Sequence, residues 1–128
     1  MPILKDFQLP ASAAELDLSG SSNSTLFIAF ISSADPRTGA PWCPDVRATL
    51  PGIREAFASD GTPDLVIAEV GQIPEWRDSK NIFRTKWDVH NVPTLARFKL
   101  VNGKVSEKGR LVEGDLLDAQ RLSDFIKQ

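Results

Sequence analysis

The sequence predicts one α/β domain, in which a central mixed sheet of about five strands is flanked by helices. Two apolar runs that favour β structure, Leu26–Ile31 and Leu65–Val70, are separated by a segment with helical periodicity. A third run, Leu95–Val101, leads into Asn102-Gly103, the strongest two-residue signal for a β-hairpin. Strands that alternate with helices and end in a hairpin are typical of one mixed sheet.

Length, composition and charge narrow the class of protein. The 128 residues suffice for one core, so residues 1–128 are taken as a single domain. The net charge of −2 gives no electrostatic basis for binding nucleic acid or an anionic membrane, and no apolar run approaches the roughly 20 residues of a membrane span. The amino terminus lacks the layout of a signal peptide. The single cysteine excludes an internal disulfide and an all-cysteine metal site, so we expect a cytoplasmic protein without a metal or cofactor.

The first third of the chain contains two predicted strands. Ile3–Leu9 alternates loosely and predicts a short strand, and Ala11–Leu18 predicts a weak short helix. The Ser, Gly and Asn residues of Gly20–Ser24 indicate a loop. Thr25–Ile31 is almost uninterruptedly apolar, which is typical of a strand buried on both faces. Ser32–Pro41, which contains Asp35-Pro36 and Gly39, is predicted to be a long loop.

A helix is predicted from Cys43 to about Ala58, ended by Asp60–Pro63. The spacing places its apolar residues on one face: Val46, Leu50, Ile53 and Phe57. Pro51 lies in the interior, where proline removes a hydrogen bond, and we expect it to kink the helix.

The remaining elements follow in order. After the strand Leu65–Val70, Pro74–Arg77 indicates a loop or single turn, and Asp78 or Ser79 could cap a helix that runs to about Trp87. The hairpin partner, Lys104 to about Leu111, is expected to be antiparallel and at the edge of the sheet. Gly114-Asp115 is predicted to open a final helix with an apolar stripe at Leu116, Ala119, Leu122 and Ile126.

Cys43 is the leading candidate for a reactive residue, because it lies where a loop enters a helix. Unpaired backbone N–H groups and the positive end of the helix dipole favour a thiolate there. A lone cysteine is more often a buried, inert residue, but the position after Trp42 favours the reactive interpretation. Pro44 removes one N–H donor. Asp45 has opposing effects, since its charge disfavours a thiolate whereas its place in the first helical turn suits the dipole.

The segment Trp42-Cys43-Pro44-Asp45-Val46 resembles the Trp-Cys-x-x-Cys active site of thioredoxin-fold oxidoreductases, with valine at the second cysteine position. Two further features agree with a thioredoxin-like fold. Pro51 follows position 46 by five residues, where thioredoxins commonly have a helix-kinking proline, and Val92-Pro93-Thr94 resembles the cis-proline element that faces the active cysteine. The resemblance implies that Pro93 is cis.

A larger set of residues is similar to the thioredoxin domain-containing protein 17 family, from about Thr25 to the carboxy terminus. Beside Trp42–Asp45 and Val92–Thr94, the set comprises Val70-Gly71, Pro74, Trp76, Asp78, Asn81 and Phe83-Arg84, with the same lengthened loop at Ser32–Pro41. That family has Trp-Cys-Pro-Asp-Cys. The resemblance implies a cytosolic thiol–disulfide oxidoreductase that thioredoxin reductase reduces. The sequence departs from it at Val46, and Ala29 occupies the place of the thioredoxin family's buried carboxylate.

The leading hypothesis is a monothiol redox protein. Disulfide exchange proceeds through a mixed disulfide, which a second thiol on the same helix face resolves in dithiol enzymes. Val46 cannot do this. Cys43 would therefore attack a protein or small-molecule disulfide, a glutathione adduct or a peroxide, and an external thiol such as glutathione would complete the cycle. Trp42, Pro44, Asp45, Val92 and Pro93 would form the substrate groove, with the Val92 backbone pairing with an extended substrate.

Two competing hypotheses remain: a redox-inactive binding module that keeps the groove, and a structural role with Cys43 buried. Val46 is interpreted as core packing or as a substitution that prolongs an adduct with a partner, and Trp42 as a substrate platform or a rim residue. His90 could form a Cys–His pair, although a surface position is favoured.

The other candidates are assigned structural roles. Trp76 and Trp87 are interpreted as packing residues, and three carboxylates are too scattered for a metal site: Glu69, Glu75 and Asp78. Lysines on the predicted edge strand favour a monomer.

Overall fold

The computed structural model describes residues 3–4, 7–18, 24–59 and 61–127. A five-stranded sheet has the order β1-β3-β2-β4-β5. The strands are β1 (Ile3–Leu4), β2 (Thr25–Ile31), β3 (Asp64–Glu69), β4 (Thr94–Val101) and β5 (Lys104–Val112). β3 is parallel to β1 and β2, whereas β4 is antiparallel to both β2 and β5. The predicted mixed sheet, with the hairpin partner β5 at its edge, is therefore confirmed.

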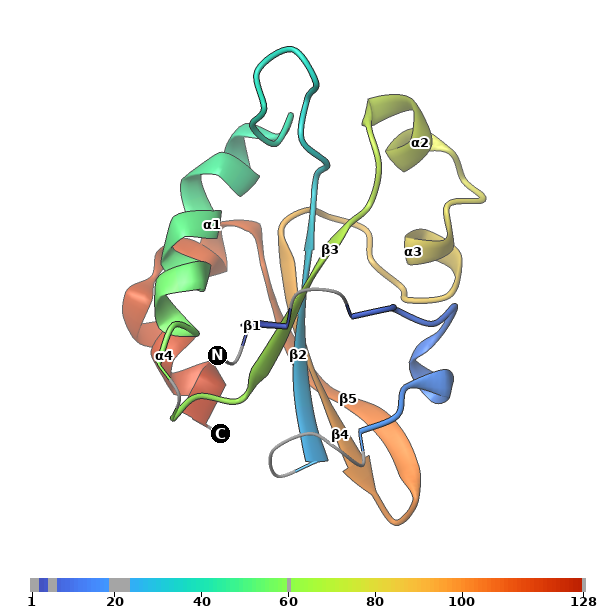
Figure 1. The fold of residues 1–128 in the computed structure, drawn as a ribbon, viewed down its shortest axis with the longest axis vertical. Helices are drawn as coiled ribbons and strands as arrows, with labels where there is room; N and C mark the ends of the chain where they lie inside the picture. Colours follow the sequence, from blue (N-terminus) through green and yellow to red (C-terminus); the bar gives the residue numbers. More distant parts are fainter. Residues whose placement is uncertain (1–2, 5–6, 19–23, 60, 128) are drawn as a thin grey trace.

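Helices lie on both faces of the sheet (Figure 1). α1 (Pro44–Ala56) and α4 (Ala119–Lys127) lie on one side, and the short helices α2 (Ile73–Arg77) and α3 (Ile82–Thr85) lie on the other. Two 3₁₀ turns complete the described elements, η1 (Ala13–Glu15) and η3 (Glu113–Leu117). Among the described residues, no helix is long and apolar enough to cross a membrane.

The core is built on both faces of β2, whose seven residues are all buried, as predicted. On the α1 and α4 face, the ring of Phe27 lies 5.3 Å from that of Phe57 and 5.5 Å from that of Phe125. On the opposite face, the ring of Phe30 lies 5.8 Å from that of Trp87. Phe27 and Phe30 are three residues apart, so their side chains lie on opposite faces of the strand. Each ring packs against the helical layer on its own face, and β2 therefore contacts both layers.

Several predicted elements are shorter than expected. The strand predicted at Ile3–Leu9 is limited to β1 among the described residues, and the helix predicted at Ala11–Leu18 is only the single turn η1. α1 ends at Ala56 rather than Ala58, and Pro51 lies in its interior. Residues 19–23 and 60 lie outside the described part of the chain, and with them most of the loop predicted at Gly20–Ser24 and the start of Asp60–Pro63.

Two helix starts were predicted at the wrong residue. Asn81, not Asp78 or Ser79, caps α3, because its Oδ1 accepts a hydrogen bond of 2.9 Å from Phe83 N. The carboxylate of Asp78 instead accepts from Lys80 N within a turn. The last helix begins after Asp118, whose Oδ1 accepts from Gln120 N and Arg121 N, so the predicted helix from Gly114-Asp115 is divided into η3 and α4.

Candidate functional site

The site lies at one edge of the sheet, where four segments distant in sequence come together. In the strand register, Ile31 at the end of β2 pairs with Glu69 at the end of β3. Thr94 at the start of β4 pairs with Phe30 and with Val112 at the end of β5. The segments after Ile31, after Glu69, before Thr94 and after Val112 are therefore neighbours. They contain the sequence-predicted residues from Trp42 to Asp45, together with Val92 and Pro93.

Cys43 is the N-cap residue of α1 and is partly buried. Its backbone N–H donates to Ser32 Oγ at 3.1 Å, so the first residue after β2 fixes the entrance to the helix. Its Sγ lies 3.8 Å from Val92 O, within reach of a weak S–H···O interaction. The Val92-Pro93 peptide bond is cis, as the resemblance implied. The structure therefore brings Cys43 and the cis-proline segment together.

Trp42 is held in place by the backbone of the loop after β3. Its indole Nε1 donates to Gly71 O at 2.9 Å, and its backbone N–H donates to Ser33 O at 3.3 Å. Gly71 N in turn donates to Ser33 Oγ at 3.0 Å. Gly71 has φ +110°, and a Cβ there would lie 2.8 Å from Glu75 Cβ, so the loop needs glycine at this position. This network fixes the ring beside Cys43.

A depression of about 320 Å³ opens beside the cysteine. It is lined by Trp42, Cys43, Ile73, Trp76, Arg77, Arg84, His90, Asn91, Val92 and Glu113. The guanidinium carbon of Arg84 lies 3.8 Å from the centre of the Trp76 ring, and Arg84 Nε donates to Trp76 O at 2.6 Å. This arrangement combines a cation–π contact with a hydrogen bond. The lining thus combines aromatic and aliphatic side chains with two arginines, and its acidic residue is Glu113.

Position 46 points away from this depression. Val46 is fully buried in the core, which agrees with its interpretation as a packing residue. Pro44 is in the first turn of α1 and is exposed, and Asp45 is exposed beside it. The site thus presents one thiol to the depression.

His90 is exposed, and its Nε2 lies 2.7 Å from Asp88 Oδ1. It lines the depression, but its ring contacts Asp88 rather than Cys43, so a surface position is the better description. Trp76 and Trp87 are buried as predicted, and Trp76 also lines the depression.

Sequence reasoning missed part of the site. Ser32 and Ser33 directly follow a buried strand, and polar residues at a strand end are a usable signal. Their partners could not be inferred. Cys43, the partner of Ser32, lies across the long loop after β2, and Gly71, the partner of Ser33, is brought close by the register between β2 and β3. The stacking of Arg84 on Trp76 carries no local sequence signal.

Comparison with known proteins decides the family. The model of the thioredoxin domain of thioredoxin domain-containing protein 17-like proteins matches residues 8–123. The chain belongs to this family. It is 42% identical over 104 residues to a thioredoxin domain-containing protein of Schizosaccharomyces pombe, covering 81% of this chain and 84% of that protein.

Other relatives and a solved structure are also similar to this chain. Thioredoxin domain-containing protein 17 of Homo sapiens is 34% identical over 97 residues, covering 74% of this chain and 72% of that protein. Thioredoxin-like protein Clot of Arabidopsis thaliana is 35% identical over 109 residues, covering 80% and 77%. A thioredoxin of Plasmodium falciparum superposes with a TM-score of 0.57 at 14% identity, covering 84% of this chain and 75% of that one. The fold is therefore thioredoxin-like, and membership of the family indicates a function of the thioredoxin type.

Proposed function

We propose that the protein is a thiol–disulfide oxidoreductase of monothiol type, with Cys43 as its nucleophile. The observation that supports this best is the pairing of one thiol at the open depression with a fully buried valine one helical turn away. Cys43 Sγ is 3.8 Å from Val92 O, beside the cis-proline segment where a substrate disulfide would be held.

The proposed cycle has two exchanges. The Cys43 thiolate attacks the glutathione sulfur of the mixed disulfide in a glutathionylated substrate. The Cys43–glutathione disulfide forms as the substrate–glutathione S–S bond breaks, and the substrate sulfur leaves as a thiolate that takes a proton from water. A glutathione thiolate then attacks the glutathione sulfur of this disulfide. Oxidised glutathione is released, and the Cys43 thiolate is restored. Because valine has no thiol, the second exchange requires the external thiol.

Two arginines that line the depression support an anionic thiol as the resolving partner. Arg84 is held by Trp76, and Arg77 lines the same depression. Glutathione has two carboxylates that these guanidinium groups could bind. A protein substrate would present an extended segment to the Val92 backbone. We place this chemistry in the cytoplasm, where thiols are kept reduced.

The test is removal of glutathione from a glutathionylated peptide, with reduced glutathione as the only reductant. We expect turnover by the parent protein, none by Cys43→Ser, and a Cys43–glutathione adduct in mass spectra when reduced glutathione is withheld. Insulin reduction with thioredoxin reductase should stay low.

Binding of the peptide without turnover or adduct would contradict the proposal and favour the redox-inactive binding module. Neither binding nor adduct would favour a structural role.

A further inference from the structure

Glu113 lies at the Cys43 depression but has no part in the proposed exchange cycle. It follows β5 directly and is the first residue of η3. Its backbone N–H donates to Pro93 O at 3.0 Å, and Pro93 follows Val92, whose carbonyl oxygen lies 3.8 Å from Cys43 Sγ. Glu113 also lines the depression together with Cys43 and Val92. An acidic residue is therefore attached to the segment that would hold a substrate.

The backbone of Glu113 has a conformation that glutamate rarely adopts. Its φ is +46°, in the left-handed region, where the Cβ of an L-residue is disfavoured. Glycine would adopt this conformation without steric cost, so the turn alone does not explain a glutamate at this position. Strained residues of this kind cluster at functional sites. The conformation is therefore evidence that the side chain of Glu113 has a role at the depression.

The carboxylate of Glu113 is not used by the fold. Within the part of the chain that the structure describes, it forms no ion pair and accepts no hydrogen bond from a side chain. Two nearby carboxylates differ in this respect: Asp115 pairs with Arg121 at 2.9 Å, and Glu107 pairs with Arg110 at 2.6 Å. Glu113 is half-buried, so its charge is only partly exposed to water. It is available to a cationic group of a ligand.

The other charged side chains of the depression come from different elements. Arg77 on α2 and Arg84 on α3 would bind the carboxylates of glutathione, whereas Glu113 adjoins the cis-proline segment, where the protein part of a substrate would pair with Val92. A cysteine becomes glutathionylated through its thiolate, and a lysine or arginine beside it favours that thiolate. The chemistry that produces the substrate therefore places a cation next to the mixed disulfide.

We propose that Glu113 selects glutathionylated proteins with a lysine or arginine next to the modified cysteine. The inference rests on the proposed oxidoreductase function and names the substrate class of the same site. The substrate segment pairs with the Val92 backbone, and its basic side chain lies against the Glu113 carboxylate. Acidic segments are disfavoured, because like charges at the same place repel. Glu113 determines specificity and takes no part in the exchange of bonds.

The test compares three glutathionylated peptides that differ only in the residue next to the modified cysteine, which is lysine, alanine or glutamate. Deglutathionylation is measured with reduced glutathione as the reductant, and the uncatalysed rate is subtracted. For the parent protein, kcat/KM should fall in that order. The preference should weaken at roughly 1 M salt, where the Debye length is only about 3 Å.

The decisive quantity is the ratio of kcat/KM for the lysine peptide to that for the alanine peptide. A lysine beside the substrate thiol also makes it a better leaving group, and this effect is the same for every variant. A change in Cys43 reactivity alters both rates alike and cancels in the ratio. Glu113→Gln should lower the ratio about threefold to fivefold, and Glu113→Lys should lower it further.

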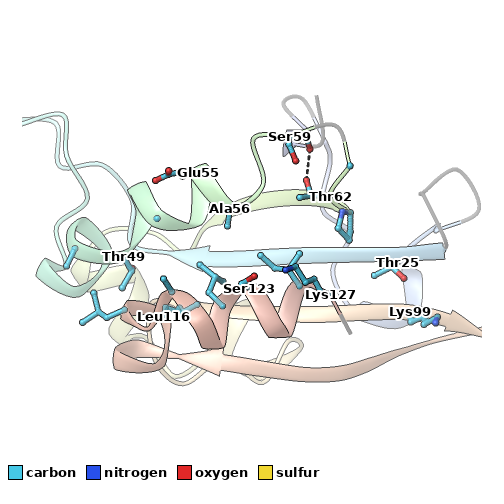
Figure 2. Close-up of a pocket in the computed structure, with 18 of the residues that line it drawn as sticks. Thr25, Thr49, Glu55, Ala56, Ser59, Thr62, Lys99, Leu116, Ser123 and Lys127 are labelled. Atoms are coloured by element: carbon cyan, nitrogen blue, oxygen red, sulfur yellow. Dashed lines mark hydrogen bonds between the residues drawn. The ribbon is translucent and has the colours of Figure 1, made fainter.

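Glu55→Gln is the matched control. Glu55 is exposed on α1 and lines a separate cavity of about 1160 Å³, which shares no lining residue with the Cys43 depression (Figure 2). The substitution removes the same charge as Glu113→Gln, so it measures the effect of net charge alone. Its ratio of lysine to alanine peptide should equal that of the parent.

An unchanged ratio in Glu113→Gln, or an equal fall in Glu55→Gln, would overturn the proposal. If no peptide is turned over, the proposed function fails, and binding decides the role of Glu113 separately. Cys43→Ser, which cannot form a disulfide, is then titrated with the same peptides and followed by ¹H–¹⁵N NMR. Tighter binding of the lysine peptide, lost in Cys43→Ser/Glu113→Gln, would support selection by Glu113. Equal binding of the three peptides would refute it.

Discussion

The side chain of Val46 lies one helical turn from Cys43 and is fully buried, so a thiol placed there would approach Cys43 from the core side. We predict that Val46→Cys forms an internal disulfide on oxidation and reduces insulin faster than the parent, without glutathione, because a second thiol can resolve the mixed disulfide. The loss of buried volume should lower the free energy of unfolding by on the order of 1 kcal/mol. Thiol counts by mass spectrometry and insulin precipitation measure the two effects.

Val46→Ala is the matched control, since it shortens the same side chain without adding sulfur. It should lose stability but gain no insulin reduction. If Val46→Cys oxidises to an internal disulfide yet reduces insulin no faster than Val46→Ala, the dithiol chemistry implied by the family resemblance does not apply to this chain.

The residues of the site differ in how far the sequence predicts them. Cys43, Trp42 and Val92 belong to short motifs that the sequence shows, and the structure places them together. Ser32 is different, because its bond to Cys43 N joins residues eleven apart across a long loop. Arg84 of α3 lies over Trp76 of α2 because of how the two short helices pack together. The sequence of either helix alone does not predict this packing.

Replacement of two glycines by alanine should change the free energy of unfolding in opposite directions. Gly52 is in the interior of α1, where a Cβ meets nothing, so Gly52→Ala should raise the free energy of unfolding by about 0.5–1 kcal/mol through helix propensity. Gly71 has φ +110° and a Cβ position 2.8 Å from Glu75 Cβ. Gly71→Ala should therefore destabilise the fold, by about 1–3 kcal/mol. Urea unfolding of both variants tests the pair, and similar effects of the same sign would refute it.

Arg110 fastens the edge strand β5 to the segment that leads to the cis-proline. Its Nε and Nη2 donate to the two carboxylate oxygens of Glu107 at 2.6 Å, and its Nη1 donates to Asp88 O at 2.7 Å. The hydrogen bond to Glu107 raises the pKa of Arg110 above its usual value. Because the pKa of Arg110 is higher in the folded state, this contribution to stability is complete below the unfolded-state pKa and is lost only as the pH rises through the folded-state pKa. It is therefore complete at neutral pH.

We predict that Arg110→Met lowers the free energy of unfolding by about 1–2 kcal/mol, because Asp88 O loses a donor and the bidentate pair is broken. Arg110→Lys should recover only part of this, since an ammonium group cannot reproduce the fork. Chemical denaturation at neutral pH measures both variants. A free energy of unfolding equal to that of the parent in Arg110→Met would contradict the prediction, and would show that water replaces the hydrogen bonds of Arg110 without loss of stability.

The bounds of the long elements agree with the apolar pattern of the sequence, whereas the starts of the shorter helices are set by their capping residues. β2 and α1 are predicted almost to the residue, because many apolar positions specify each of them. α3 and α4 begin where Asn81 and Asp118 accept backbone hydrogen bonds. Several Asp, Asn and Ser residues near these starts could serve as caps, and only the tertiary positions of the following apolar residues select one.

At the scale of the whole molecule, the longer of the two sheet edges is β5. β5 has nine residues and pairs with β4 on one side, whereas β1 at the opposite edge has two. Lys104, Glu107, Lys108 and Arg110 give β5 a charged sequence. Charged side chains on an edge strand oppose pairing with another chain, because pairing would bring like charges together and desolvate them. The edge strand was predicted from Asn102-Gly103, whose φ angles of 54° and 78° confirm the hairpin.

We therefore predict a monomer that depends on this charge. The parent protein should sediment as a single species of one chain mass at every concentration tested, whereas Lys104→Val/Lys108→Val should self-associate as its concentration rises. Valine favours β structure, so the fold of the variant should be retained and its β5 edge made available for pairing. The control Lys99→Val/Lys127→Val removes the same charge from β4 and α4, away from the edge strand, and should remain monomeric. A parent dimer, or equal association of both variants, would show that the edge charges do not determine the oligomeric state.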